Sequence, residues 1–219
     1  EWQVKNMVRR MARSIDKSLL RGDGSLSGFT AAPSASVVVN TGMASVITGI
    51  AQLAYNISGL RVSTGGTSTK ATPATIASAR AVMGRYGLQV GTNNLVYFTS
   101  IEGYNDLVTT SDFRTIDKIG PLATYLTGQV GAIYGIPVVV TEFLDVVGVS
   151  GNIVGLLAYL PNFIIGTRRA LDIESQYDPR RQLTAVYIST RWDMKALTTN
   201  ASAVLDATKY STAVAVHSA

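Results

Sequence analysis

Two long extended segments in the last third of the chain constrain the fold most, because together they predict an unusually long β-hairpin. Residues 162–175 read NFIIGTRRALDIES and residues 182–196 read QLTAVYISTRWDMKA. The intervening QYDPRR contains Asp178 followed by Pro179, a pair typical of a turn. We therefore expect a two-stranded unit that is separate from the central region of the chain.

The alternation of side chains along a strand assigns the two faces of this hairpin. In the first segment, Leu171 and Ile173 share one face, and Asp172 and Glu174 share the other. The second segment alternates Thr184, Val186, Ile188, Thr190 and Trp192 against Leu183, Ala185, Tyr187 and Ser189.

The N-terminal segment predicts a long amphipathic helix. Its apolar residues recur at steps of three and four, which places them in one stripe. Gly22 directly follows the last of them, where a left-handed glycine cap belongs. The tripeptide that starts at Arg21 is also used by integrin ligands, but a helix stop does not present the exposed loop tip that adhesion requires. We therefore interpret residues 19–28, LLRGDGSLSG, as the end of the helix. The stripe consists of Val4, Val8, Met11, Ile15 and Leu19.

Helix and strand patterns alternate in the central region, which predicts an α/β or α+β layer. Thr72 is a good N-cap and Pro73 suits the first helical position, so a helix should start there and stop at Gly87. Residues 58–71 are rich in Gly, Ser and Thr and predict a surface loop. The expected elements are helices over 44–57, 73–87 and 101–108 and strands over 95–100 and 131–143, the last broken by Gly135 and Pro137.

Composition favours a folded protein and excludes several kinds of chemistry. The 219 residues are 47% hydrophobic and 15% charged, enough for one substantial core or two small ones. The chain has no cysteine, which excludes disulfides, thiolate metal sites and cysteine nucleophiles within it. His217 is the single histidine, so a histidine-based triad or a histidine-rich metal site cannot be assembled from this chain alone.

Two segments match catalytic or binding loops only in part. Residues 64–72, TGGTSTKAT, hold the glycines, lysine and hydroxyls of a phosphate loop, but Thr69 stands where a Walker motif has glycine. Residues 148–152, GVSGN, fall one residue short of a nucleophile elbow and have no histidine base. A mobile loop and a turn are the favoured interpretations.

Two uncharged stretches have the length of a membrane span. They cover Gly120–Thr141 and Val146–Thr167. Prolines interrupt both, and glycines and asparagines interrupt the second, which suits buried strands and turns better than a spanning helix. We expect no membrane partner.

Arginine dominates the positive charge and is clustered along the chain. The formal net charge is +5, and 13 of the 19 basic residues are arginine. Because guanidinium groups pair with carboxylates and phosphates, protein surfaces and nucleic acid both stay open as partners. The interleaved aromatic side chains of many nucleic-acid sites are missing apart from Trp192. A protein built to assemble fits these features. The candidate inter-subunit or DNA-facing contacts are Arg9, Arg10, Arg13, Arg168, Arg169, Arg180, Arg181 and Arg191.

Three segments together resemble a known family. They are ARSIDKSLLRGDGS (12–25), GQVGAIYGIPVVVTEFL (128–144) and the complete hairpin region with its flanks (162–197). In order and local pattern they resemble the major capsid protein of tailed bacteriophages, whose fold also occurs in encapsulins and in the capsid floor of herpesviruses. The resemblance covers nearly the whole chain. It implies an α+β fold with an axial domain and a peripheral domain, the latter containing a long spine helix and a β-hairpin.

The resemblance also implies domain boundaries. Residues 1–24 would form the spine helix of the peripheral domain, 25–158 the axial domain, 159–195 the peripheral β-hairpin, and 196–219 a return toward the axial domain. Gly22, Asp23 and Gly24 occupy the family's turn at the domain junction. In this family an N-terminal arm and an extended loop precede the spine helix, so further chain is expected before Glu1.

The implied function is structural, without enzymatic activity, cofactor or metal. Copies of the chain would form hexamers and pentamers of an icosahedral shell that encloses double-stranded DNA. The implied partners are other copies of the chain, packaged DNA bound without sequence specificity, and scaffold, portal or decoration proteins. The implied location is the virion capsid, after assembly in the host cytoplasm.

Two alternatives remain open. An encapsulin would use the same fold as a cellular nanocompartment around a cargo enzyme. A soluble α/β enzyme would bind a phosphorylated ligand at residues 64–72 and would form a monomer or a small oligomer.

Overall fold

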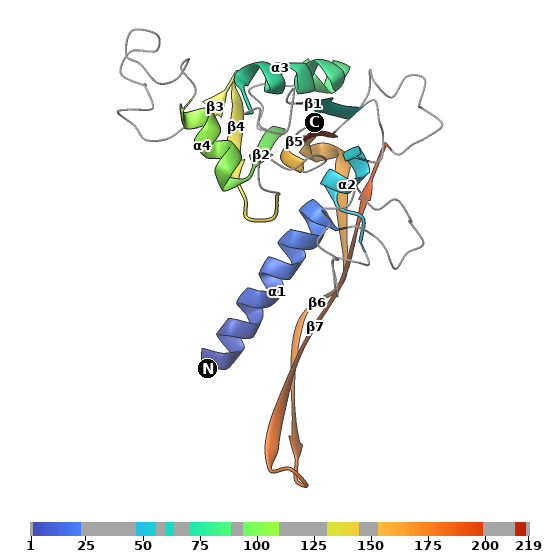
Figure 1. Cartoon of the computed structure of the whole chain (residues 1–219). Coiled ribbons are helices and arrows are strands. Elements are labelled where there is room, and N and C mark those ends of the chain that lie inside the picture. Colours follow the sequence, from blue (N-terminus) through green and yellow to red (C-terminus); the bar gives the residue numbers. More distant parts are fainter. Residues whose placement is uncertain are drawn as a thin grey trace.

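The computed structural model describes residues 2–22, 47–55, 60–63, 71–88, 94–109, 131–144, 153–198 and 213–217. These residues form a body built on a six-stranded sheet and an arm that extends from it (Figure 1). The arm consists of helix α1 (Trp2–Arg21) and the hairpin of β6 (Phe163–Asp178) and β7 (Leu183–Ala196). The hairpin reaches well past the N-terminal end of α1 (Figure 1).

The body sheet is mixed, so the predicted α+β class is confirmed. Its strand order is β1-β8-β5-β2-β4-β3. The pairs β1–β8 and β2–β4 are parallel, and the other three pairs are antiparallel. The strands are β1 (Arg61–Ser63), β2 (Leu95–Thr99), β3 (Ala132–Ile133), β4 (Ile136–Val140), β5 (Ile153–Tyr159) and β8 (Ala213–His217).

Strand β5 separates two hydrophobic cores. Val154 and Leu157 belong to one core, with residues of α3 (Pro73–Val82) and α4 (Ile101–Thr109). Ile153 and Leu156 belong to the other, with residues of α2 (Ile50–Tyr55). A strand covered on both faces is expected to be apolar throughout, as IVGLLAY is.

Gly155 makes this arrangement possible. The register of β5 against β8 shifts between Ile153 and Gly155. After this shift, each residue of β5 points to the face opposite to the one that regular alternation would give it. A Cβ at position 155 would lie 2.8 Å from Cζ of Tyr97, so only glycine leaves room for that ring. Tyr97 is fully buried, and the loss of water around its hydroxyl raises its pKa to about 12. Tyr97 is therefore a neutral core residue.

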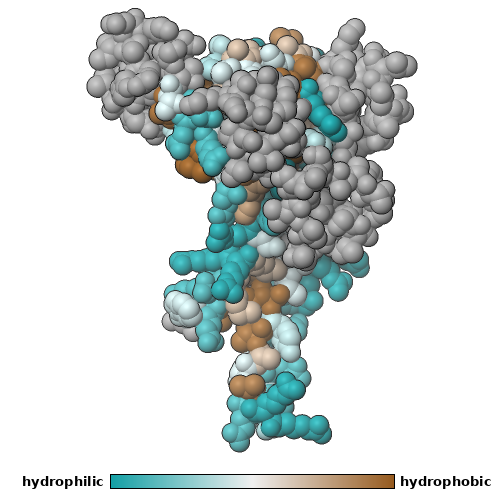
Figure 2. Space-filling model, in the orientation of Figure 1, coloured by the Kyte–Doolittle hydropathy of each residue, from teal (hydrophilic) through white to brown (hydrophobic). Residues whose placement is uncertain are grey.

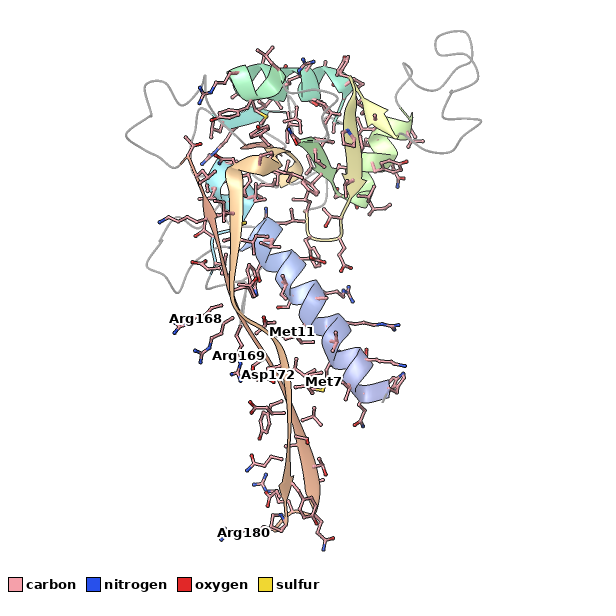
Figure 3. The ribbon with its side chains drawn as sticks, turned by 180° about the vertical axis from the view of Figure 1, so that it is seen from behind. Met7, Met11, Arg168, Arg169, Asp172 and Arg180 are labelled. Atoms are coloured by element: carbon pink, nitrogen blue, oxygen red, sulfur yellow. The ribbon has the colours of Figure 1, made fainter. Side chains whose placement is uncertain are left out.

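The predicted N-terminal helix is confirmed as α1, and its apolar stripe is its less exposed face. Met11 and Met7 lie on the side of α1 that is next to the hairpin (Figure 3). Near the body, Leu19 and Leu20 pack against the core that contains Met194. The five predicted stripe residues, Val4, Val8, Met11, Ile15 and Leu19, are all half-buried.

The predicted left-handed cap at Gly22 is wrong. Gly22 does not have a positive φ, although its N–H still donates to Ser18 O at 3.0 Å. It is required because another segment passes too close for a side chain: a Cβ on Gly22 would collide with the carbonyl oxygen of Ile47. Gly49 lies on the other side of this contact: its own Cβ would lie 2.5 Å from Gly22 N, and its N–H donates to Gly22 O at 2.8 Å. We call this contact of two backbones at Gly22 and Gly49 the glycine crossing.

The start of α3 is confirmed, but its end is earlier than predicted. Thr72 and Thr75 form a reciprocal capping box, and Pro73 occupies the first turn. The helix ends at Val82, because Gly84 adopts a left-handed φ of 58° and a 3-10 turn follows. Gly87 is the fourth of the five residues of that turn, Gly84–Leu88, and does not stop the helix.

Three further predictions for the body need correction. A helix was predicted over residues 44–57, but α2 starts at Ile50. Residues 47–49 are described and are not helical, so the prediction is wrong for them. The predicted loop 58–71 contains strand β1. The predicted strand 131–143 is a tight hairpin, since Tyr134 and Gly135 both have positive φ and β3 pairs antiparallel with β4. Strand β2 and helix α4 match their predictions.

The long hairpin is confirmed as a separate two-stranded sheet. Its turn contains Gln182 with a φ of 51°. The register shifts twice along β6, between Thr167 and Arg169 and between Arg169 and Asp172. Each shift places an extra residue on β6, which increases the twist of the ribbon. The predicted alternation holds beyond these bulges.

Some sequence predictions lie outside the described residues. These are Asp23, Gly24, residues 64–70 of the proposed phosphate loop, and residues 148–152. Of the described helices, none is both long enough and apolar enough to cross a membrane. The second uncharged stretch instead contributes β5 and the start of β6.

Candidate assembly surface

The predicted arginines all lie on the arm, but the structure does not gather them into one cluster. Arg9, Arg10 and Arg13 are exposed on α1. Arg168 and Arg169 lie near the middle of the hairpin and point away from α1 (Figure 3). Arg191 is paired in register with Arg169, whereas Arg180 and Arg181 lie at the hairpin turn.

Arg13 joins the arm to the body. Its Nε donates to Glu142 Oε1 at 2.8 Å and its terminal nitrogen donates to Glu142 Oε2 at 2.6 Å. Glu142 follows β4, 129 positions along the chain. The two side chains remain more than half exposed, so solvent weakens the pair. Arg13 thus has a partner within its own chain.

Arg169 also has partners within its own strand. It pairs with Asp172, and it lies 3.4 Å from Glu174 Oε1. Thr190 on β7 donates to the carbonyl oxygen of Arg169 at 3.1 Å. The Thr190 hydrogen bond ties the bulged part of β6 to β7, and the ion pairs of the Arg169 side chain lie within β6.

The remaining arginines predicted as contacts differ in this respect. Within the part of the chain that the structure describes, none of them has a carboxylate at ion-pair distance. Their side chains are exposed. They are Arg9, Arg10, Arg168, Arg180, Arg181 and Arg191.

Large apolar side chains are exposed along the arm, and this feature was not singled out from the sequence. Figure 2 shows hydrophobic surface along the hairpin, with hydrophilic surface at its tip. Large exposed apolar patches often mark surfaces that bind another macromolecule. The hairpin residues concerned are Ile164, Ile165, Leu171, Ile173, Tyr177, Leu183 and Tyr187, each between 47% and 62% exposed.

The described residues offer little for catalysis. Among them, no three His, Asp or Glu side chains lie close enough to hold a metal ion. The hydroxyl of Tyr97 is buried against Gly155 and out of reach of a substrate. The features of this surface are those of an interface between macromolecules.

Comparison with solved structures identifies the fold. The capsid chain of an empty GTA particle superimposes with a TM-score of 0.68, covering 100% of this chain and 65% of that chain at 13% identity. The satellite phage P4 procapsid gives a TM-score of 0.53, covering 99% of this chain and 66% of that chain at 14% identity. This chain has the fold of tailed-phage capsid proteins.

A sequence relative points the same way. The major capsid protein of Escherichia phage T5 is 31% identical over 128 residues, which are 58% of this chain and 27% of that protein. The chain therefore spans about a quarter of the curated relative and just under two thirds of the capsid chains that share its fold. No family model matches the sequence. The capsid fold expected from local sequence patterns is confirmed.

Proposed function

We propose that this chain is a structural subunit of an icosahedral shell, in which copies assemble as hexamers and pentamers. The observation that carries the proposal is the match of the entire chain, body and arm together, to a capsid subunit of a GTA particle. The relationship to the T5 major capsid protein supports the same function. The protein would then be located in the virion.

The geometry of the arm suits this function. The arm exposes apolar side chains at a distance from the body's own cores, where another subunit can cover them. Repeated heterologous contacts close a shell when each rotation closes a ring. Many moderate interfaces then stabilise the shell together, because each bound neighbour raises the effective concentration of the next.

The structure supports a specific domain division as part of this proposal. The axial domain would comprise residues 25–158 and contain most strands of the body sheet. The peripheral domain would comprise the spine helix, residues 1–24, and the hairpin, residues 159–195. Residues 196–219 would return to the axial domain, which is consistent with the position of β8 between β1 and β5.

The arginines without a partner in the described chain would serve the contacts of the shell. Arg180 and Arg181, exposed at the turn, would pair with carboxylates of a neighbouring subunit. Arg9 and Arg10 lie on the opposite side of α1 from its apolar stripe and would suit either a neighbour or the phosphates of packaged DNA. Scaffold, portal and decoration proteins would be further partners.

The alternatives receive less support. The curated relative is a phage protein, which favours a phage shell over an encapsulin. The relatives have a structural role, which favours a protein without enzymatic activity over a phosphate-binding enzyme.

Sedimentation of the purified full-length protein tests the proposed function. We expect closed particles that sediment as megadalton species and appear as uniform shells by electron microscopy. A protein that stays a monomer or small oligomer under all assembly conditions, with its scaffold present, contradicts the proposal. Binding of a phosphorylated ligand by such a small species, lost in Lys70→Ala, would establish the enzyme alternative instead.

A further inference from the structure

Two short segments join the hairpin to the body. One is the 3-10 turn η6 (Leu160–Asn162), which lies between β5 and β6. The other is the pair Leu197 and Thr198, which directly follows β7. Leu160 N donates to Asn94 O at 2.8 Å, which fixes the start of η6 to the residue before β2 of the body sheet. We call these two segments the hairpin base.

Asn162 ties the two segments of the hairpin base together. Its carbonyl oxygen accepts from Leu197 N at 2.8 Å. Its side-chain Oδ1 accepts twice from Thr198, from the backbone N–H at 3.1 Å and from the hydroxyl Oγ1 at 2.6 Å. Asn162 is only 4% exposed, and the two bonds satisfy both lone pairs of its amide oxygen. These bonds lie beyond the hairpin ladder, whose last pair is Phe163 with Ala196.

Thr198 is tied to the body as well. Its side chain is hydrogen-bonded to Tyr86, in the 3-10 turn that follows α3. The ring of Tyr86 lies 5.0 Å from the ring of Tyr159 at the end of β5, and its hydroxyl accepts from Arg85 Nη2 at 3.0 Å. Thr198 is therefore a shared partner of Asn162 on the arm and of Tyr86 on the body.

The other contacts at the hairpin base are apolar and restrict its direction less sharply. Phe163 and Met194 pack with the core that contains residues of α2 and β5. Apolar packing is non-directional, whereas a hydrogen bond weakens steeply when its angle changes. Rotation of the hairpin about η6 would break either the bonds between Asn162 and Thr198 or the bond between Thr198 and Tyr86.

We propose that Asn162 and Thr198 form a lock that fixes the direction of the hairpin relative to the body, and that the hairpin turns about η6 when this lock is open. The inference goes beyond the proposed function and does not depend on it, because every contact lies within one chain. The hairpin extends far from its base, so a small rotation there displaces its exposed residues by a much larger distance (Figure 1). The lock therefore sets where those residues lie in the unassembled subunit.

The distance between two spin labels measures the direction of the hairpin, and the chain has no cysteine of its own. Ser78→Cys on α3 and Ser175→Cys on β6 place one label on each part, at exposed positions. We expect a single narrow distance distribution for unassembled subunits of the full-length protein. Asn162→Leu should at least double its width, because leucine has the same branched shape but accepts no hydrogen bond. Thr198→Val should broaden it as well, whereas Thr198→Ser, which keeps the hydroxyl, should preserve the wild-type width.

Thr190→Val is the matched control. It removes a hydroxyl that donates from β7 to Arg169 O within the hairpin, and it leaves the hairpin base intact. This variant should keep the narrow distribution. Circular dichroism identifies the variants that remain folded, and if Asn162→Leu does not fold, Thr198→Val decides the outcome because that side chain is exposed. An unchanged width in Thr198→Val, or equal broadening in Thr190→Val, overturns the proposal.

Discussion

Gly22 is a residue at which the backbone of the arm contacts the backbone of the body directly. Its backbone N–H continues the hydrogen bonding of α1 to Ser18, and its carbonyl oxygen accepts from the N–H of Gly49. Gly49 O in turn accepts from Leu53 N in α2. The two glycines therefore let the end of α1 and the start of α2 share one continuous set of backbone hydrogen bonds.

Substitution of Gly22 should show that space, and not backbone conformation, requires glycine there. Gly22→Ala should destabilise the unassembled subunit by roughly 2–3 kcal/mol, because its Cβ collides with the backbone of Ile47. Gly22→Asn should be at least as harmful, although asparagine is accepted at left-handed helix caps. Urea denaturation followed by circular dichroism measures both effects.

Gly166 offers a matched control for this experiment. A Cβ at that position has no atom within 4 Å, and its φ is not in the left-handed range. Gly166→Ala should therefore leave the stability unchanged or increase it by about 0.5 kcal/mol. If asparagine at position 22 is tolerated and alanine is not, the left-handed cap predicted from the sequence is correct after all.

At this scale, the sequence predicts residues whose role depends on their immediate neighbours. Thr72 and Pro73 were assigned correctly because a cap acts within a single turn. Gly22 was recognised as the end of a helix, but its reason lies 25 or more positions away, at Ile47 and Gly49. Contacts of this kind leave no local pattern in the sequence.

At the scale of elements, α1 makes two polar contacts with the body, besides the apolar packing of Leu19 and Leu20. One is the glycine crossing, and the other is the pair of Arg13 with Glu142. The glycine crossing is made by uncharged backbone atoms, so salt does not screen it. The ion pair is exposed and is screened by salt. The ion pair therefore contributes mainly to the direction of the helix.

A double-mutant cycle should measure this contribution. For Arg13→Gln and Glu142→Gln, we expect a coupling free energy of about 0.5–1 kcal/mol at low salt, since exposed pairs seldom exceed this range. The coupling should fall toward zero in molar salt. Urea denaturation of the four proteins provides the values.

Arg9 serves as the control for that cycle, since it lies one turn away on α1 and has no carboxylate partner in the described chain. Arg9→Gln should show no coupling with Glu142→Gln. Equal coupling of Glu142 to Arg9 and to Arg13 would mean that general charge, and not the observed pair, joins the helix to the body.

The elements also differ in how far the sequence predicts them. Helix α1 and the hairpin have periodic patterns over 14 residues or more, and both were predicted. Strand β1 has three residues and depends on a parallel pairing with β8, more than 150 positions later, so its sequence reads as a loop. The apolar side chains of the hairpin were visible in the sequence as an alternation, but an alternation alone does not tell which of them stay exposed.

At the scale of the whole molecule, body and arm divide two tasks. The body buries two cores on either side of one sheet. The arm leaves apolar surface and several arginines without partners in the described chain. A monomer gains nothing from such an arm, whereas a subunit of a shell uses it to meet its neighbours.

Cryo-electron microscopy of particles formed by the full-length protein tests the central claim most directly. We predict an icosahedral reconstruction in which the sheet bodies cluster around the five-fold and six-fold centres and the density of each subunit accommodates both the body and the arm. A preparation that contains only small soluble species, or a shell whose density does not accommodate this body and arm, would contradict it.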